Sequence, residues 1–133
     1  MSLSDGLQAA AIAALKADAD VAALVAGRVL EEAQAASVFP YLAIGPWRAK
    51  AWNAGGERGE EIVFVLQAFV RKGGRGAALN LIGRCGVALD GAALTIEGGR
   101  VVGVFFQDAE VALEKDKQTW RAMGRFRALV EQT

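Results

Sequence analysis

The stretch Glu61–Arg71 constrains the fold more than any other part of this sequence. Successive side chains of a strand point to opposite faces of a sheet, and here both alternating sets are apolar. One set is Ile62, Phe64, Leu66, Ala68 and Val70, and the other is Val63, Val65 and Phe69. A strand that is apolar on both sides is covered, at least in part, on both faces. We therefore expect Glu61–Arg71 to be a central strand.

The C-terminal part of the chain predicts a long antiparallel hairpin, Val101–Lys115 with Thr119–Glu131, turning at Asp116-Lys117. In this register Lys115 faces Gln118, and on each side of the hairpin the facing side chains are of compatible kinds. Apolar or small residues oppose one another in the pairs Leu113–Trp120, Val111–Ala122 and Ala109–Gly124. The other side pairs Glu114 with Thr119, Glu110 with Met123 and Asp108 with Arg125, with Arg121 nearby. A shift of one residue destroys both matches, so the pattern specifies the register and turns Trp120, Ala122 and Phe126 toward the core.

The remaining elements complete an α+β order. Apolar residues at helical spacing predict helices over residues 3–17, 21–26 and 77–89, the first with a capping box formed by Ser2 and Asp5. Residues 28–32, 41–52 and 94–97 read as strands, with a bend at Gly45-Pro46 and a hairpin turn at Gly98-Gly99. We therefore expect one domain, residues 1–133, with a mainly antiparallel sheet and helices packed on one face.

The composition excludes most catalytic chemistry. The 133 residues include no histidine and one cysteine, Cys85, which lies on the apolar stripe of its helix. We therefore expect no catalytic residue, no metal ligand and no cofactor-binding residue. Gly73–Gly76 has neither the third glycine of a dinucleotide site nor a P-loop lysine, and predicts a plain turn. No apolar run is long enough to cross a membrane, and Met1–Asp5 lacks a basic signal segment.

Two groups of residues are candidates for contact with partners. The first is Trp47, Arg48, Lys50 and Trp52, beside a glycine-rich loop, residues 53–60, that includes Arg58 and is expected to be mobile. Alternatively, both tryptophans pack against the edge of their own domain. The second group is Arg121, Arg125 and Arg127, which either pair across strands with Asp108 and Glu110 or face a partner or a channel.

Segments spread over nearly the whole chain resemble the tail-completion or tail-terminator proteins of long-tailed phages and gene transfer agents. They are Leu7–Ala10, Leu15–Asp18, Leu24–Val29, Phe39–Gly45, Val65–Arg71 with Gly74 and the helix at 77–89, Asp116, Thr119–Arg121 and Arg125–Ala128. The order and spacing of these segments carry the resemblance. The chain departs from the family in being rich in alanine and glycine.

The resemblance implies a structural subunit without catalytic residues or cofactors. Such a subunit forms a ring, hexameric in related proteins, that sits on the last ring of the tail tube and joins it to the head connector or stopper protein. Its partners would be copies of itself, the tail tube protein and the connector, with DNA only in passage and no membrane. It would assemble in the host cytoplasm and end in the virion tail.

Two other functions remain open from the residues alone. A small ligand-binding or regulatory α+β domain would share this fold and composition. A hydrolase without histidine would need two carboxylates in a concave pocket, and the acidic residues available are Glu31, Glu32, Glu60, Glu61, Asp108, Glu110 and Glu114.

Overall fold

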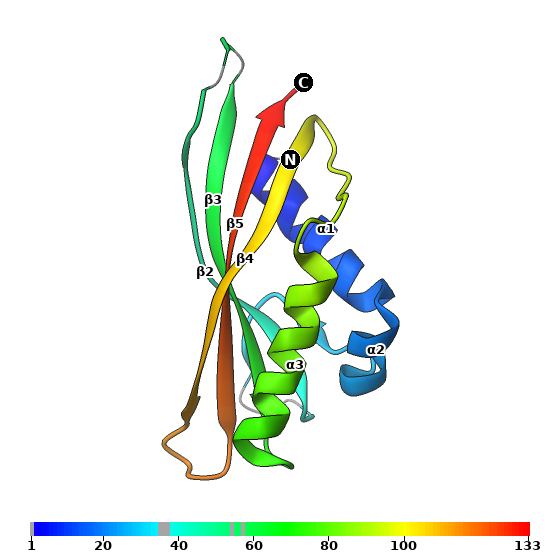
Figure 1. Cartoon of the computed structure of the whole chain (residues 1–133), viewed down its shortest axis with the longest axis vertical. Helices are drawn as coiled ribbons and strands as arrows, with labels where there is room; N and C mark the ends of the chain where they lie inside the picture. The colour runs from blue at the N-terminus through cyan, green and yellow to red at the C-terminus, as the bar shows by residue number, and fades with distance from the viewer. Residues whose placement is uncertain (1, 35–37, 54, 57) are drawn as a thin grey trace.

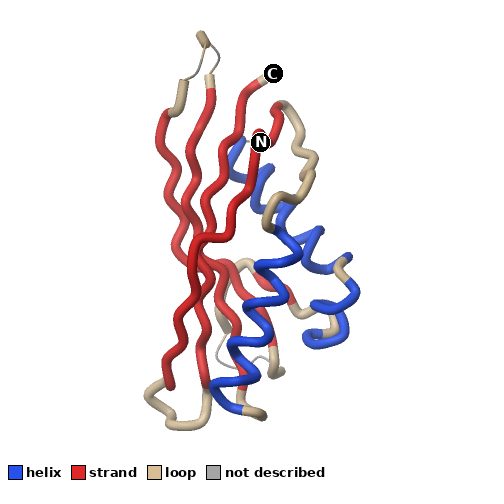
Figure 2. Tube along the Cα trace, in the orientation of Figure 1, coloured by secondary structure: helices blue, strands red, loops and turns tan. Residues whose placement is uncertain are grey.

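The computed structural model describes residues 2–34, 38–53, 55, 56 and 58–133 as one sheet with the helices packed on one face (Figure 1). The elements are α1 (Leu3–Ala17), α2 (Ala19–Val25), β1 (Val29–Leu30), β2 (Tyr41–Ala51), β3 (Gly59–Val70), α3 (Gly74–Leu89), β4 (Gly99–Leu113) and β5 (Trp120–Gln132). The expected α+β class, with helices on a single face, is confirmed (Figure 2).

The strand order in the sheet is β1-β2-β3-β5-β4. All neighbours pair antiparallel except β1 and β2, which are parallel. The strand predicted at Glu61–Arg71 is β3, and it is central as expected. It is also covered on both sides in part, since Phe69 is buried with Tyr41 and Ala43 on the face without helices.

The predicted C-terminal hairpin is confirmed in its register. Leu113 pairs with Trp120, and the pairs run without a shift as far as Asp108 and Arg125, where a bulge begins. The turn is wider than the two residues expected. β4 ends at Leu113 and β5 begins at Trp120, because the carboxylate of Asp116 accepts hydrogen bonds from the backbone amides of Gln118 and Thr119 and holds residues 115–118 as a loop.

Polar side chains cap the N-termini of the first two helices. The Ser2 hydroxyl accepts a hydrogen bond from the Asp5 amide, and the Asp18 carboxylate accepts one from the Val21 amide, so α2 begins two residues earlier than expected. α3 also begins early, at Gly74, because Gly73 adopts a φ of 93° and starts the helix inside the predicted turn.

The strand predicted at residues 94–97 is wrong, and the strand predicted at residues 28–32 is shorter than expected. Residues 94–97 form no strand; instead Ile96 is buried, so its apolar side chain anchors a loop to the core. This loop follows a contact with β4 in which Gly91 donates to the Val104 carbonyl at 2.8 Å. The strand expected at residues 28–32 is limited to Val29–Leu30, because the chain that follows is exposed.

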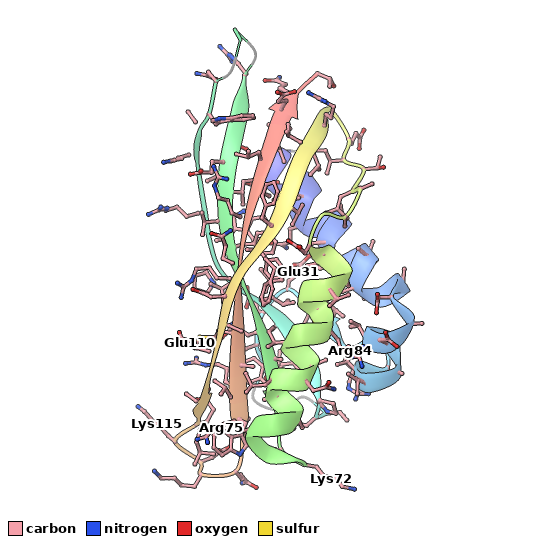
Figure 3. The ribbon with its side chains drawn as sticks, viewed as in Figure 1. Glu31, Lys72, Arg75, Arg84, Glu110 and Lys115 are labelled. Atoms are coloured by element: carbon pink, nitrogen blue, oxygen red, sulfur yellow. The ribbon has the colours of Figure 1, made fainter. Side chains whose placement is uncertain are left out.

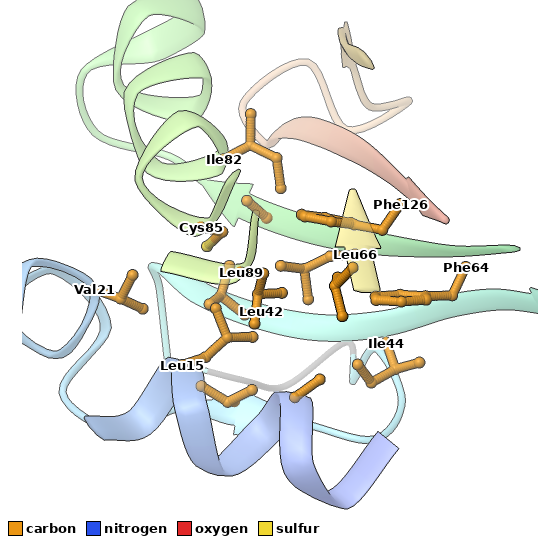
Figure 4. Close-up of a cluster of buried hydrophobic side chains, with 14 of the residues drawn as sticks. Leu15, Val21, Leu42, Ile44, Phe64, Leu66, Ile82, Cys85, Leu89 and Phe126 are labelled. Carbon is orange, nitrogen blue, oxygen red and sulfur yellow. The ribbon is translucent and has the colours of Figure 1, made fainter. Parts of the chain in front are cut away.

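The core lies between the helices and the sheet (Figure 4). An aromatic row crosses four neighbouring strands within it: Trp47 stacks on Phe64 with centroids 4.7 Å apart, Phe64 on Phe126 at 5.2 Å, and Phe126 contacts Phe106 at 5.1 Å. Cys85 is fully buried here, and burial raises the pKa of its thiol to about 12. It is therefore a small core side chain, as its helical position predicts.

Candidate functional site

The face of the sheet opposite the helices brings together the two groups of basic residues that the sequence singles out. We call it the open face. The strand register sets Arg48 of β2, Val63 of β3, Arg127 of β5 and Phe105 of β4 in one row across this face. Arg121 and Arg125 follow on the same side of β5, because side chains alternate along a strand.

Glu61 connects the two groups. Its carboxylate accepts a hydrogen bond from Arg127 Nε at 2.7 Å, and Lys50 Nζ lies 3.3 Å from its other oxygen. The hydrogen bonds from Arg127 and Lys50 hold the pKa of Glu61 below its ordinary value. The open face therefore carries a row of alternating charges formed by Arg127, Glu61 and Lys50. The sequence alone marks Glu61 only as one of two adjacent acids, Glu60 and Glu61.

The arginines of β5 are paired with acidic residues. Arg125 Nη1 lies 3.5 Å from Asp108, and Arg121 Nε lies 3.1 Å from Glu114. The cross-strand alternative thus holds for Arg125 with Asp108. Glu110 lies opposite Met123, as the predicted register requires, and Figure 3 shows it on the side of the sheet away from the helices.

Trp47 does not share the open face. Between the pairs Ile44–Leu66 and Trp47–Phe64, two residues of β2, Gly45 and Pro46, lie opposite one residue of β3. This bulge turns Trp47 to the core side, where it stacks on Phe64. The backbone amide of Trp52 donates to the Gly59 carbonyl at 2.9 Å and closes the β2–β3 hairpin. The alternative that the tryptophans pack on their own domain is therefore observed for Trp47.

Arg58 lies at the exposed end of the same hairpin, where its carbonyl accepts a hydrogen bond from the Gln132 amide at 2.8 Å. The loop expected at residues 53–60 is shorter, because Gly59 and Glu60 already belong to β3. Residues 54 and 57, also part of that expectation, lie outside the described residues.

One concave site does hold two carboxylates. A pocket of about 360 Å³ is lined by Glu114 and Asp116 together with Arg71 and Thr119. A general acid requires a raised pKa, but hydrogen bonds from the Thr119 hydroxyl and from the Gln118 and Thr119 amides lower the pKa of Asp116 to about 2. Glu114 already faces Arg121. Both carboxylates therefore have partners that stabilise the β4–β5 turn and the strand ends beside it.

The low pKa of Asp116 predicts an acid-sensitive turn. A carboxylate with a folded pKa near 2 and an ordinary value of 3.8 contributes stability that is complete above 3.8 and is lost as the pH falls through about 2. Thermal unfolding followed across this window should show the loss. Asp116→Asn, which keeps an acceptor oxygen but no charge, should flatten it. An unchanged pH dependence in that variant would contradict the assignment.

A second pocket, about 330 Å³, is mainly apolar. It lies between α2, α3 and the end of β3, where Leu24, Phe39, Pro40, Val70 and Leu81 line it with Arg71 and Lys72 at its rim. Among the described residues no group of three His, Cys, Asp or Glu side chains is placed to hold a metal ion. No helix in the described part of the chain has the length and apolar character needed to span a bilayer.

Comparison with known proteins first defines a class. A chain in a solved structure described as the virion of a native gene transfer agent particle has the same fold, with a TM-score of 0.88 and 29% sequence identity over 98% of both chains. No curated protein matches this chain. The shared fold thus relates the chain to the virion proteins of phage-like particles. More narrowly, it belongs to the family of Tail completion protein gp17, whose family model matches residues 9–131. The resemblance inferred from the sequence is confirmed.

Proposed function

We propose that this chain is the ring-forming subunit that ends the tail tube of a phage-like particle and joins it to the head connector. The observation that carries the proposal is the family match over residues 9–131, supported by a fold shared along 98% of a chain from a gene transfer agent virion. The ring, hexameric by the family resemblance, forms on the last ring of the tube. Its partners are the tail tube protein on one side and the connector or stopper on the other.

A closed ring meets the physical demands of this role. A terminator must bind the tube end and present an opposite face that the tube subunit cannot use. Cyclic symmetry repeats one modest contact between subunits several times and leaves two different faces. Each contact needs only roughly 800 Å² per partner, so the subunit can stay monomeric until the tube end brings copies together.

The charge distribution fits the passage of DNA through such a ring. Fifteen basic and fifteen acidic residues cancel, and on the open face the arginines of β5 are each opposed by an acid. Phosphate-binding affinity grows with the number of cations that are free to neutralise phosphates. A lumen lined by paired charges would let DNA slide without holding it.

The contact residues proposed from the sequence are revised by their placement. Arg48, Lys50 and Arg58 are exposed at the β2 side and hairpin end, and they remain candidates for contact with a neighbouring subunit or the tube. Arg121, Arg125 and Arg127 are candidates as a charged surface of the open face. Trp47 packs on Phe64 of its own domain, and Trp52, which is partly exposed at the end of the hairpin, remains a candidate.

Removal of the gene from the particle-producing host tests this function. We expect tails of abnormal length, or tails that never join heads, and a yield of joined particles that is restored by supplying the gene in trans. Electron microscopy of the lysate measures both. Normal joined particles from the strain without the gene would refute the assignment.

The apolar pocket favours one other function, a small ligand-binding domain. Its volume of about 330 Å³ lies at the lower end of the range for small-molecule sites, which is roughly 300–1,000 Å³. Self-association measured with and without candidate apolar ligands separates the two functions. Assembly that depends on a ligand would favour this second function over the first.

A further inference from the structure

The sheet leaves part of its β2 edge unpaired. β1 pairs with β2 only at Leu42 and Ala43, so no described strand lies outside Ile44–Ala51. Pro46 and the bulge interrupt the first part of this stretch, and Trp47–Ala51 is regular. Its exposed side chains are basic or small, and Arg48 makes no ion pair within the described part of the chain. An unpaired edge is a template for another strand.

The opposite edge, β4, is also free along one half. Near its start, Gly91 and the Asp90 carboxylate occupy the outer backbone groups of Val104 and Phe106. Beyond that point no strand in the described ranges pairs with the outer side of β4. The free half is exposed and acidic on the open face. Glu110, labelled in Figure 3, has no ion-pair partner there among the described residues.

We propose that the free edge of β2 pairs with the free edge of β4 in a second copy of this chain, with Arg48 opposite Glu110. This inference rests on the ring proposed above and specifies its subunit contact. In the sheet order, β4 runs antiparallel to β2. Two copies in the same orientation therefore form an antiparallel pair, with helices on the same side of the joined sheet.

The register with Arg48 opposite Glu110 matches both faces. On the open face it sets Lys50 opposite Asp108, so both cross-strand pairs join a base to an acid. On the helix side the pairs that follow are Trp47 with Val111 and Ala49 with Ala109, which are apolar or small. A one-residue slip would turn charged side chains against apolar ones, so the pattern specifies a single register.

The same charges disfavour pairing of like edges. Two β2 edges would bring Arg48 and Lys50 against their own copies, and two β4 edges would do the same with Asp108 and Glu110. Like charges directly opposite each other in a sheet are destabilising. Only head-to-tail pairing joins opposite charges, and head-to-tail contacts are the kind that close into rings.

The geometry of the free stretches also suits closure. Within one copy the register places Ala49 level with Val104, five residues before Ala109. Because the β4 bulge lies within this stretch, it spans four residues of β5, from Ala128 to Gly124. Pairing Ala49 with Ala109 of the next copy therefore offsets the two copies by about 13 Å along the strands, at ~3.3 Å per residue. The four strands between the edges span roughly 19 Å at ~4.8 Å each. Strands tilted by about 35° to the ring axis absorb this offset, which is within the range of closed sheets.

A disulfide crosslink tests the contact. Facing residues of antiparallel strands have Cα atoms about 5 Å apart, within the range that a disulfide bridges. The double variant Ala49→Cys, Ala109→Cys should give, in oxidised particles, a ladder of linked chains up to the closed ring. Native Cys85 is fully buried and stays in place. Each single variant should give no ladder. Dimers from Ala49→Cys alone would show like-edge pairing and overturn the proposal.

Charge reversal gives a second, independent test. Arg48→Glu and Glu110→Arg alone should each lower the yield of joined particles by about tenfold or more, because like charges then face each other across the contact. Combining both changes in one chain should restore the yield, as should mixing the two single variants. Failure of both rescues would overturn the pairing.

The pairing and the function fail separately in these experiments. Joined particles that contain the double cysteine variant but give no crosslink overturn the edge pairing and leave the tail function standing. Normal particles from a host without the gene overturn the tail function. In that case a crosslinked ladder from concentrated purified protein would still support the pairing.

Discussion

Replacing Phe126 with alanine is expected to lower the free energy of unfolding by about 3–5 kcal/mol. Phe126 is fully buried and lies at the middle of the aromatic row, with Phe64 on one side at 5.2 Å and Phe106 on the other at 5.1 Å. Removing the ring leaves a cavity that touches strands β3, β5 and β4 at once. Chemical denaturation of the purified variant measures the loss.

Phe105→Ala is the matched control, since Phe105 lies on the neighbouring strand but is 41% exposed on the open face. It should cost about 1 kcal/mol or less, the range of substitutions away from a packed core. Equal losses in the two variants would contradict the placement of the aromatic row. A large loss for Phe105 alone would mean that the two faces of β4 are exchanged.

Two glycines of α3 provide the second large effect. Gly86→Ala and Gly83→Ala each gain about 1 kcal/mol of helix propensity. A Cβ on Gly86 would lie 2.8 Å from the ring of Phe106, whereas a Cβ on Gly83 meets nothing within 4 Å. Overpacking typically costs about 1–3 kcal/mol, and the gain in helix propensity is the same for both variants, so their free energies of unfolding should differ by about 1–3 kcal/mol.

Thermal unfolding of both variants under one condition measures this difference. Gly83→Ala should be more stable than the parent chain, and Gly86→Ala less stable than Gly83→Ala. The close approach of α3 to β4 is what requires glycine at position 86. Equal stabilisation by both substitutions would show that Phe106 moves aside freely and that this contact is loose.

The hairpin of β4 and β5 could be predicted from the sequence because its information is local. Leu113 and Trp120 are separated by a short turn, and both faces of the pair carry a pattern that only one register satisfies. The first helix was predictable for the same reason, since its cap and its apolar spacing lie within one segment. Only the width of the turn, set by the Asp116 side chain, differed.

The failures have physical causes that sequence spacing does not reveal. Leu94 and Ile96 alternate like a strand, but they anchor a loop to the core. Trp47 was expected beside Arg48 in a contact surface. One extra residue at the Gly45-Pro46 bulge turns it to the opposite face, and proline at that position was the only local signal of the change.

The charged site depends on strand order, which one sequence does not specify. Glu61 and Arg127 are 66 residues apart, and they meet only because β5 inserts between β3 and β4. Lys50 reaches the same carboxylate from the other side. The sequence therefore indicates the two basic groups separately, and it marks Glu61, the acid that joins them, only as one of several available acidic residues.

An electron cryo-microscopy reconstruction of particles assembled with this chain tests the proposed function directly. We expect a closed ring of copies of this chain between the last ring of the tail tube and the head connector, with the sheet edges of neighbouring copies in contact. A particle in which the chain is absent, or in which it occupies a position away from the head end of the tail, would contradict it.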